Sequence, residues 1–172
     1  MKPGHFYCEH CGVAHFGAPA LNLKLPDPVI EAQSRGHRVS TGSSVCQILN
    51  PKPKRHFIKS NIEIPIDGGK KKLDYGGWVE VEHSDLMTYL NYRNVMKKVR
   101  IPGFLASKFP GLEDSYGTPV LLTVKHEDYY PHFQPLEESS SMYQDFHKGI
   151  SSREADLRIN SWLLVSCAVS SL

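Results

Sequence analysis

The fold is decided by the stretch Phe57-Ile58-Lys59-Ser60-Asn61-Ile62-Glu63-Ile64-Pro65-Ile66, which Asp67-Gly68-Gly69 follows directly. The isoleucines at 62, 64 and 66 have the two-residue period of a β-strand with one buried face. A second alternating stretch, Gly76-Gly77-Trp78-Val79-Glu80-Val81-Glu82, comes shortly afterwards. Because Asp67-Gly68-Gly69 and Tyr75-Gly76-Gly77 have the composition of turns, we predict an antiparallel pair of strands here.

Further strands and helices are predicted on both sides of this pair. The additional strands are a short one at 45–49 and a central one at 119–126 with two apolar faces. One helix is predicted to begin near Asp27 and to stop at Gly36. A second begins near Ser84 or Asp85 and runs to about Val99, and a third begins at the capping-box sequence that starts with Ser151. This mixed order predicts an α+β fold, with an antiparallel-rich sheet, two or three helices and an N-terminal zinc-knuckle-like turn.

Length and composition are those of one ordinary globular domain. The chain has 172 residues, of which 40% are hydrophobic and 22% charged, so it is neither disordered nor too small to bury a core. We predict a single domain over 1–172, in which a Cys-containing N-terminal region, 6–50, packs on an α+β core, 51–172.

Charge and hydropathy exclude several classes of protein. The net charge is +2, and the basic runs at 51–56 and 70–72 are short, so nucleic-acid binding is not expected. No apolar segment follows Met1-Lys2-Pro3-Gly4-His5, and the longest apolar run, Trp162-Leu163-Leu164-Val165, is too short to span a bilayer. We therefore expect a cytoplasmic protein without a membrane segment, whose thiols stay reduced.

The stretch Phe6-Tyr7-Cys8-Glu9-His10-Cys11-Gly12-Val13-Ala14-His15 holds two Cys and two His in ten positions. The C-x-x-C spacing resembles half of a zinc knuckle, because a two-residue gap lets a tight turn direct both sulfur atoms at one tetrahedral centre. A complete site needs four ligands, and the chain has no second C-x-x-C. The predicted zinc ligands are Cys8, Cys11, Cys46 and His15, with His37 or His10 as the alternative fourth ligand.

Other roles for the Cys8 and Cys11 pair remain open. A thiol oxidoreductase would use it as a redox dithiol, although the βαβ context of thioredoxin-type motifs is absent. A metal-dependent hydrolase would need an open coordination position and a general acid or base, and Glu9 is the nearest carboxylate in sequence. Two unligated thiols without a role are the third reading. Since no H-E-x-x-H, G-x-S-x-G, Walker or G-x-G-x-x-G motif is present, a structural zinc is favoured over an enzyme.

A second cluster, His126-Glu127-Asp128-Tyr129-Tyr130-Pro131-His132-Phe133, follows the predicted central strand. Its imidazoles and carboxylates suit a metal or acid–base site, but its aromatic residues favour a loop after the strand. An exposed Tyr-rich loop would suit a protein-binding surface, because Tyr is enriched at interface hot spots. Trp78 and Phe104, each directly after Gly, are expected to anchor the core.

The order of several short motifs is more specific than any one of them. They are Phe6-x-Cys8-x-x-Cys11-Gly12, Cys46, Phe57-Ile58-x-x-x-Ile62-Glu63-Ile64-Pro65-Ile66, Gly77-Trp78-Val79-Glu80-Val81, Pro102-Gly103-Phe104-Leu105 and Gly149-Ile150-Ser151. In this order they resemble an uncharacterised bacterial domain-of-unknown-function family, from about Phe6 to Arg153. The resemblance implies a small bacterial cytoplasmic protein with no assigned activity, and it favours grouping the first three Cys. The chain departs from the family pattern at Ser43-Ser44-Val45 and Ser141-Met142-Tyr143, where acidic residues are usual.

Together these features predict a zinc-stabilised protein-binding or regulatory module, of which an immunity-type protein that blocks its partner is one form. The alternative is an enzyme, either a metal-dependent hydrolase or a thiol oxidoreductase. A third hypothesis is nucleic-acid binding through the knuckle and the Lys-rich turn at 70–72.

Overall fold

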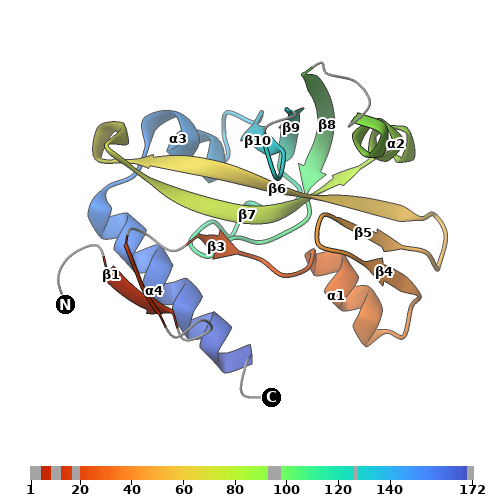
Figure 1. The fold of residues 1–172 in the computed structure, drawn as a ribbon, viewed down its shortest axis with the longest axis horizontal. Helices are drawn as coiled ribbons and strands as arrows, with labels where there is room; N and C mark the ends of the chain where they lie inside the picture. The colour runs from red at the N-terminus through yellow and green to blue at the C-terminus, as the bar shows by residue number, and fades with distance from the viewer. Residues whose placement is uncertain (1–4, 9–12, 17–19, 93–97, 126–127, 170–172) are drawn as a thin grey trace.

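The computed structural model describes residues 5–8, 13–16, 20–92, 98–125 and 128–169, and the side chains of these except for 5–8, 13–16 and 164–169. The strands are β1 (His5–Cys8), β2 (Val13–Phe16), β3 (Leu21–Asn22), β4 (Val39–Thr41), β5 (Val45–Ile48), β6 (Arg55–Ile66), β7 (Lys71–Val81), β8 (Val99–Leu105), β9 (Pro119–Val124) and β10 (His132–Pro135) (Figure 1). The helices are α1 (Asp27–Ser34), the 3₁₀ turn η1 (Asp67–Gly69), α2 (His83–Asn91), α3 (Ser141–Lys148) and α4 (Ser152–Val169).

Strands β6 to β10 close into a five-stranded barrel. Each strand pairs antiparallel with the next along the chain, and β10 returns to β6 in a parallel pair that sets His132 opposite Asn61. Strand β3 adds parallel to β7, while β5 and β4 extend the sheet beyond β6. Antiparallel pairing therefore dominates, with two parallel pairs among the described strands, and the α+β class is confirmed.

The β6–β7 hairpin forms as its sequence predicts, with its tip at Asp67–Gly69. The second predicted turn, at Tyr75-Gly76-Gly77, is wrong, because these residues lie inside β7. A Cβ atom on Gly76 would come within 1.8 Å of the Asn22 Oδ1 atom, and one on Gly77 within 2.3 Å of the Phe109 ring. These glycines make room for neighbouring side chains and do not turn the chain.

Alternation along β6 and β7 separates two apolar cores. One face of the two strands fills the barrel with Ile58, Ile62, Ile64, Ile66, Leu73, Tyr75, Val79 and Val81. The other face carries Phe57 and Trp78, which pack with Val29 of α1 and with Cys46 and Ile48 of β5. Helix α1 thus covers the outside of the barrel at the end where β4 and β5 lie (Figure 1).

Two predicted helices are confirmed at their ends. Gly36 follows α1 with a φ of 72°, as a helix stop requires. The Ser151 side chain accepts a hydrogen bond of 3.2 Å from the Glu154 N–H at the start of α4, as its capping-box sequence predicts.

The other helices differ from prediction. Helix α2 ends at Asn91, residues 93–97 lie outside the described residues, and Val99 begins a strand. Helix α3 is an addition, so the described residues contain four α-helices and not two or three. It is short and polar, and it begins where the Ser140 side chain accepts from the Tyr143 N–H. None of the helices in the described part of the chain is both long and apolar enough to cross a membrane.

Candidate functional site

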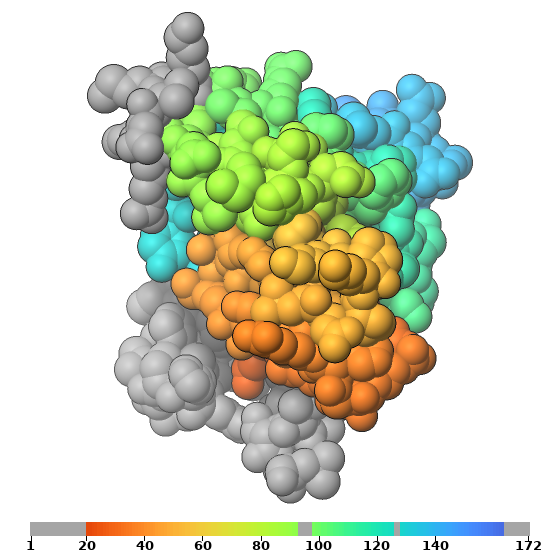
Figure 2. All heavy atoms as spheres, turned by 90° about the vertical axis from the view of Figure 1, so that its right-hand side faces the viewer, coloured from red at the N-terminus to blue at the C-terminus, as the bar shows by residue number. Residues whose placement is uncertain are grey.

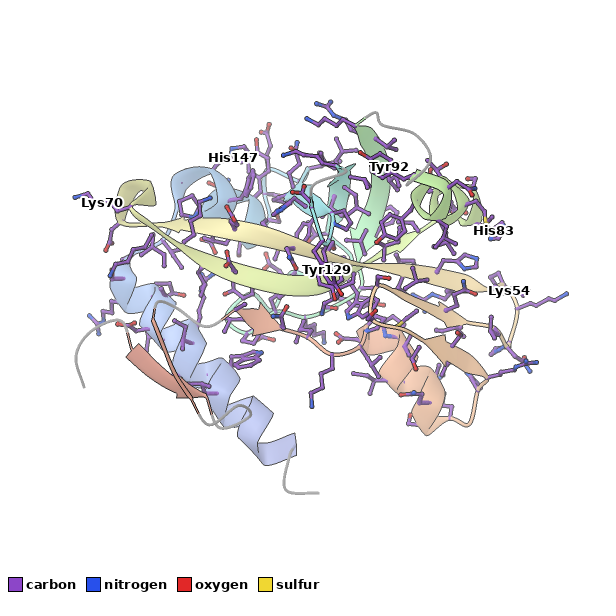
Figure 3. The ribbon with its side chains drawn as sticks, in the orientation of Figure 1. Lys54, Lys70, His83, Tyr92, Tyr129 and His147 are labelled. Atoms are coloured by element: carbon purple, nitrogen blue, oxygen red, sulfur yellow. The ribbon has the colours of Figure 1, made fainter. Side chains whose placement is uncertain are left out.

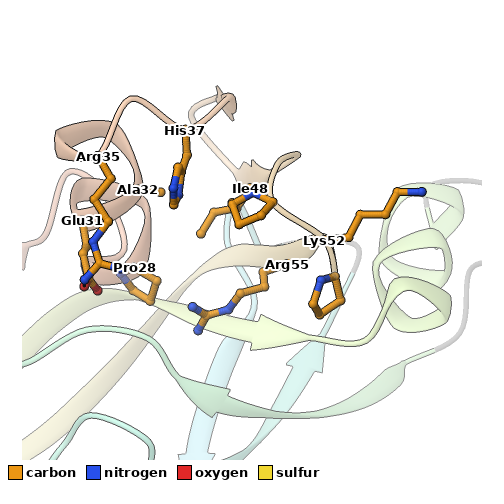
Figure 4. Close-up of a pocket in the computed structure, with 10 residues that line it drawn as sticks. Pro28, Glu31, Ala32, Arg35, His37, Ile48, Lys52 and Arg55 are labelled. Atoms are coloured by element: carbon orange, nitrogen blue, oxygen red, sulfur yellow. The ribbon is translucent and has the colours of Figure 1, made fainter.

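A hollow of about 210 Å³ opens between α1 and the loop that leads from β5 into β6 (Figure 4). Its wall on α1 carries side chains at the i, i+3, i+4 and i+7 spacing of a single helix face. The lining residues are Pro28, Glu31, Ala32, Arg35 and His37 on one side and Ile48, Pro51, Lys52, Pro53 and Arg55 on the other. Figure 2 shows this end of the molecule, where the orange residues of the β4–β5 region lie against green α2.

Arg55 is fixed in place at the edge of the hollow. Its Nε and Nη2 atoms donate to the two carboxylate oxygens of Glu80 at 2.6 and 2.7 Å. The guanidinium also lies 5.5 Å from the ring centroid of Phe57. The hydrogen bonds to Glu80 raise the pKa of Arg55, so its charge is permanent. A bidentate pair of this kind holds a guanidinium in one orientation while leaving part of it exposed.

The remaining polar side chains of the hollow are held more loosely. Arg35 pairs with Glu31 one turn earlier on α1, and both side chains are more than half exposed. Such surface pairs contribute little to stability, so another carboxylate can replace Glu31 with small loss. The His37 imidazole has no hydrogen-bond partner among the described residues, and Figure 4 shows it pointing into the space beside Ile48, while Lys52 points away.

Positive charge is concentrated in the segment that builds this end of the molecule. Residues 35–62 contain six Lys and Arg and no Asp or Glu, so the other 144 residues carry a net charge of −4. Figure 3 shows Lys54 and His83 together at this end, and Lys70 at the opposite end. The overall charge of +2 therefore conceals a basic segment, 35–62, although Glu31 and Glu80 lie beside it in the structure.

An exposed aromatic surface continues from Arg55 along the outside of the barrel. Glu80 stands opposite Phe104 in the β7–β8 register, and Phe104 stands opposite Pro119 in the next pair. Phe104 is 57% exposed and Tyr116 44% exposed. The prediction that Phe104 anchors the core is therefore wrong, because its strand turns this position outward, whereas Trp78 is buried as expected. We call the hollow together with Arg55, Phe104 and Tyr116 the α1-side surface.

A family model described as "Uncharacterized protein conserved in bacteria (DUF2199)" matches residues 7–150. The chain belongs to the DUF2199 family. The match confirms the resemblance found in the motifs and covers every residue of the α1-side surface, while α4 lies beyond it. Comparison with curated proteins and with solved structures gave no match.

The DUF2199 match also covers the predicted zinc ligands. Cys8 is the last residue of β1 and pairs with Val13 of β2, so residues 9–12 connect the two strands of a hairpin. His15 lies in β2, opposite Phe6. Cys11 and the alternative ligand His10 lie outside the described residues, as do the side chains of Cys8 and His15. The metal prediction therefore stays a prediction.

Cys46 lies elsewhere in the molecule. Figure 1 places β5 at the far end of the long axis from the β1–β2 hairpin, so the structure does not bring Cys46 to Cys8. Its thiol is fully buried and lies 3.8 Å from the Gly42 carbonyl oxygen, to which it donates. Burial raises the pKa of this thiol. The alternative ligand His37 lies in the hollow. In the described side chains no group of three or more His, Cys, Asp or Glu could hold a metal ion.

The predicted Tyr-rich loop is only partly described, because His126 and Glu127 lie outside the described residues. Tyr129 is 83% exposed and packs edge-on against Tyr130, whose hydroxyl donates to the Ser43 carbonyl. Within the described part of this loop, the His132 Nε2 atom lies 4.0 Å from the Asp128 Oδ2 atom. This DUF2199 loop thus exposes an aromatic side chain, as the sequence indicates.

The α1-side surface is the feature that sequence reasoning missed. The basic run at 51–56 is too short to predict a binding site by itself, and its partners on α1 lie about 20 residues earlier in the chain. The signal that could have found it is the absence of acidic residues from 35 to 62.

Proposed function

We propose that this DUF2199 protein is a protein-binding module that holds its partner on the α1-side surface. The observation that carries the proposal is the combination of a fixed Arg55 with the exposed Phe104 and Tyr116. Arg and aromatic residues dominate interface hot spots, and Arg55 loses little freedom on binding because Glu80 already orients it. A regulatory or immunity-type role would follow if the captured partner is inhibited.

The N-terminal hairpin has a separate role in this proposal. We propose that the β1–β2 hairpin binds a structural zinc through Cys8 and Cys11, with His15 and one further ligand. The support is the position of Cys8 at the end of β1, with the rest of the C-x-x-C sequence in the connection to β2. The thiolate ligands suit the reducing cytoplasm, where we propose that the protein acts.

Site-specific photocrosslinking in a bacterium that carries the gene tests the binding proposal. A photoreactive phenylalanine analogue replaces Phe104 in one strain and Leu157 of α4 in another, because both side chains are 57% exposed. We expect one discrete crosslinked protein from position 104 and none from position 157. The partner is then identified by mass spectrometry, purified and titrated against the wild-type chain and Phe104→Ser.

The titration decides whether the crosslink reports an interface. Losing a buried aromatic anchor weakens binding by about 2 kcal/mol, or roughly 30-fold in Kd. The proposal fails if position 104 gives no specific product, if positions 104 and 157 give the same product, or if Phe104→Ser binds the captured protein as tightly as wild type.

A further inference from the structure

We infer that the hollow between α1 and the β5–β6 loop takes a carboxylate of an acidic segment that also carries apolar side chains. This inference rests on the proposed function, since it names the chemistry of the partner segment that the α1-side surface holds. It adds a specific subsite, about one side chain in size, to the aromatic contact at Phe104.

The charges around the hollow favour an anion. Three of its lining residues are Lys or Arg and one is Glu. Arg55 donates to Glu80 through two of its five N–H groups, which leaves others for a further acceptor. Arg35 is held only by an exposed pair with Glu31, and a partner carboxylate placed between Arg35 and Arg55 would gain charge-assisted hydrogen bonds from both.

A single carboxylate suits the hollow better than a phosphate group. Arg35 and His37 lie at the C-terminal end of α1, where the last carbonyl groups give the helix a partial negative charge. Phosphate sites commonly use the opposite end of a helix, where backbone N–H groups are free. Together with Glu31 and Glu80, this end of α1 disfavours a doubly charged group and still tolerates a single negative charge.

The other walls of the hollow are apolar, which is why we expect apolar side chains next to the carboxylate in the partner segment. Pro28, Ala32, Ile48, Pro51 and Pro53 provide apolar surface between the charged groups. A nucleic-acid backbone would need an extended line of cations, but Glu31 and Glu80 interrupt the positive charge here. An acidic peptide with leucine or phenylalanine next to its glutamates matches both kinds of wall.

NMR titration of the ¹⁵N-labelled full chain at low salt tests the inference. The probe is a capped peptide in which three glutamates alternate with leucine and phenylalanine, and the matched probe carries glutamines in their place. We expect saturable shifts of the His37, Ile48 and Arg55 amides with the glutamate peptide alone. Arg35→Gln should weaken binding about threefold, as expected for one exposed charge. Lys70→Gln removes the same charge at the opposite end of the molecule and should leave binding unchanged (Figure 3).

Several results would overturn the inference. They are no saturable shift, shifts centred on the Lys70-Lys71-Lys72 turn, equal binding of the glutamine peptide, or stronger binding of inorganic phosphate or a ten-residue deoxythymidine strand. These failures leave the proposed function standing if position 104 still captures a partner. Conversely, a carboxylate site without a crosslink at 104 would remove the proposed function and keep the hollow as an isolated anion site.

Discussion

Lys59 is a buried cation whose described contacts are with uncharged groups. Its ammonium group donates to the Leu23 carbonyl oxygen and lies 5.1 Å from the ring centroid of Trp78, and no carboxylate pairs with it among the described residues. Burial lowers the pKa of Lys59 to about 8. The Leu23 carbonyl also accepts from the Trp78 indole N–H at 3.2 Å, so it keeps a partner if the lysine is removed. Lys59 therefore makes the fold sensitive to pH.

We predict that Lys59→Met removes a rise in stability between pH 8 and 10.5. In this range the unfolded chain, with an ordinary lysine pKa of 10.5, binds more protons than the folded one, so unfolding becomes harder as pH rises. Below pH 8 the full penalty, of order 3 kcal/mol, is present. Urea unfolding at pH 7 and pH 10 measures the free energy of unfolding at each pH. At pH 7 the variant should be as stable as wild type or more stable.

Lys70→Met is the matched control, because Lys70 lies exposed at the tip of the β6–β7 hairpin. It should leave the pH dependence of wild type unchanged. A Lys59→Met chain that is strongly destabilised at pH 7 would show that the cation stabilises the fold, contrary to this argument.

At the scale of elements, Arg158 ties helix α4 to the rest of the fold. Its guanidinium pairs at 2.8 Å with Asp145 of α3 and with Glu154 one turn earlier on α4, and it lies 3.5 Å from the Tyr75 hydroxyl in the barrel. The Arg158 side chain is 7% exposed and that of Asp145 18%. Removing the arginine would therefore leave a half-buried carboxylate without its cation.

We predict that Arg158→Leu lowers the free energy of unfolding by about 3 kcal/mol, as breaking one side of a buried ion pair does. Arg153→Leu removes an exposed arginine from the same helix and should change stability by about 0.5 kcal/mol or less. Urea denaturation of the three chains measures both. Equal stabilities for the two variants would mean that α4 is not held by this network.

Elements were predictable where a local pattern decides them. The isoleucines of β6 and the capping box of α4 predicted the correct strand and helix, because each pattern depends only on residues that are neighbours in sequence. Gly76 and Gly77 misled the prediction, since their role is to admit Asn22 and Phe109, which are distant in sequence. Helix α3 has too few apolar residues for its period to stand out, and its Ser140 cap alone is a common feature.

At the scale of the whole molecule, the candidate site depends on long-range assembly. Arg35 follows α1 and Arg55 begins β6, and the packing of α1 against β5 and β6 brings them to one hollow. The outward position of Phe104 follows from the register of β8 with β7, which sequence periodicity does not supply. The overall charge of +2 gave no sign of the basic segment at 35–62, although the distribution of acidic residues along the chain did.

The metal prediction also concerns the whole molecule, because binding a structural zinc is coupled to folding. We predict that the purified protein contains one equivalent of zinc, which Cys8→Ser loses together with several degrees of Tm. Cys46→Ser should retain the metal, since its thiol is buried far from the hairpin. Elemental analysis and thermal melts with and without chelator measure this. Metal-free wild-type protein that melts identically with chelator would end the zinc proposal.

The parallel pair that closes the barrel has a consequence for how the chain assembles. The β6–β7 hairpin joins residues that are near neighbours in sequence, whereas His132 and Asn61 are 71 positions apart. Bringing such distant segments together loses more chain entropy than forming a hairpin, and it gains little until the strands between them are in place. We therefore expect the meander to form first and the ring to close last. A nascent chain released before β10 would leave the edge of β6 around Asn61, next to the part that β5 covers, without the strand that pairs with it in the finished barrel.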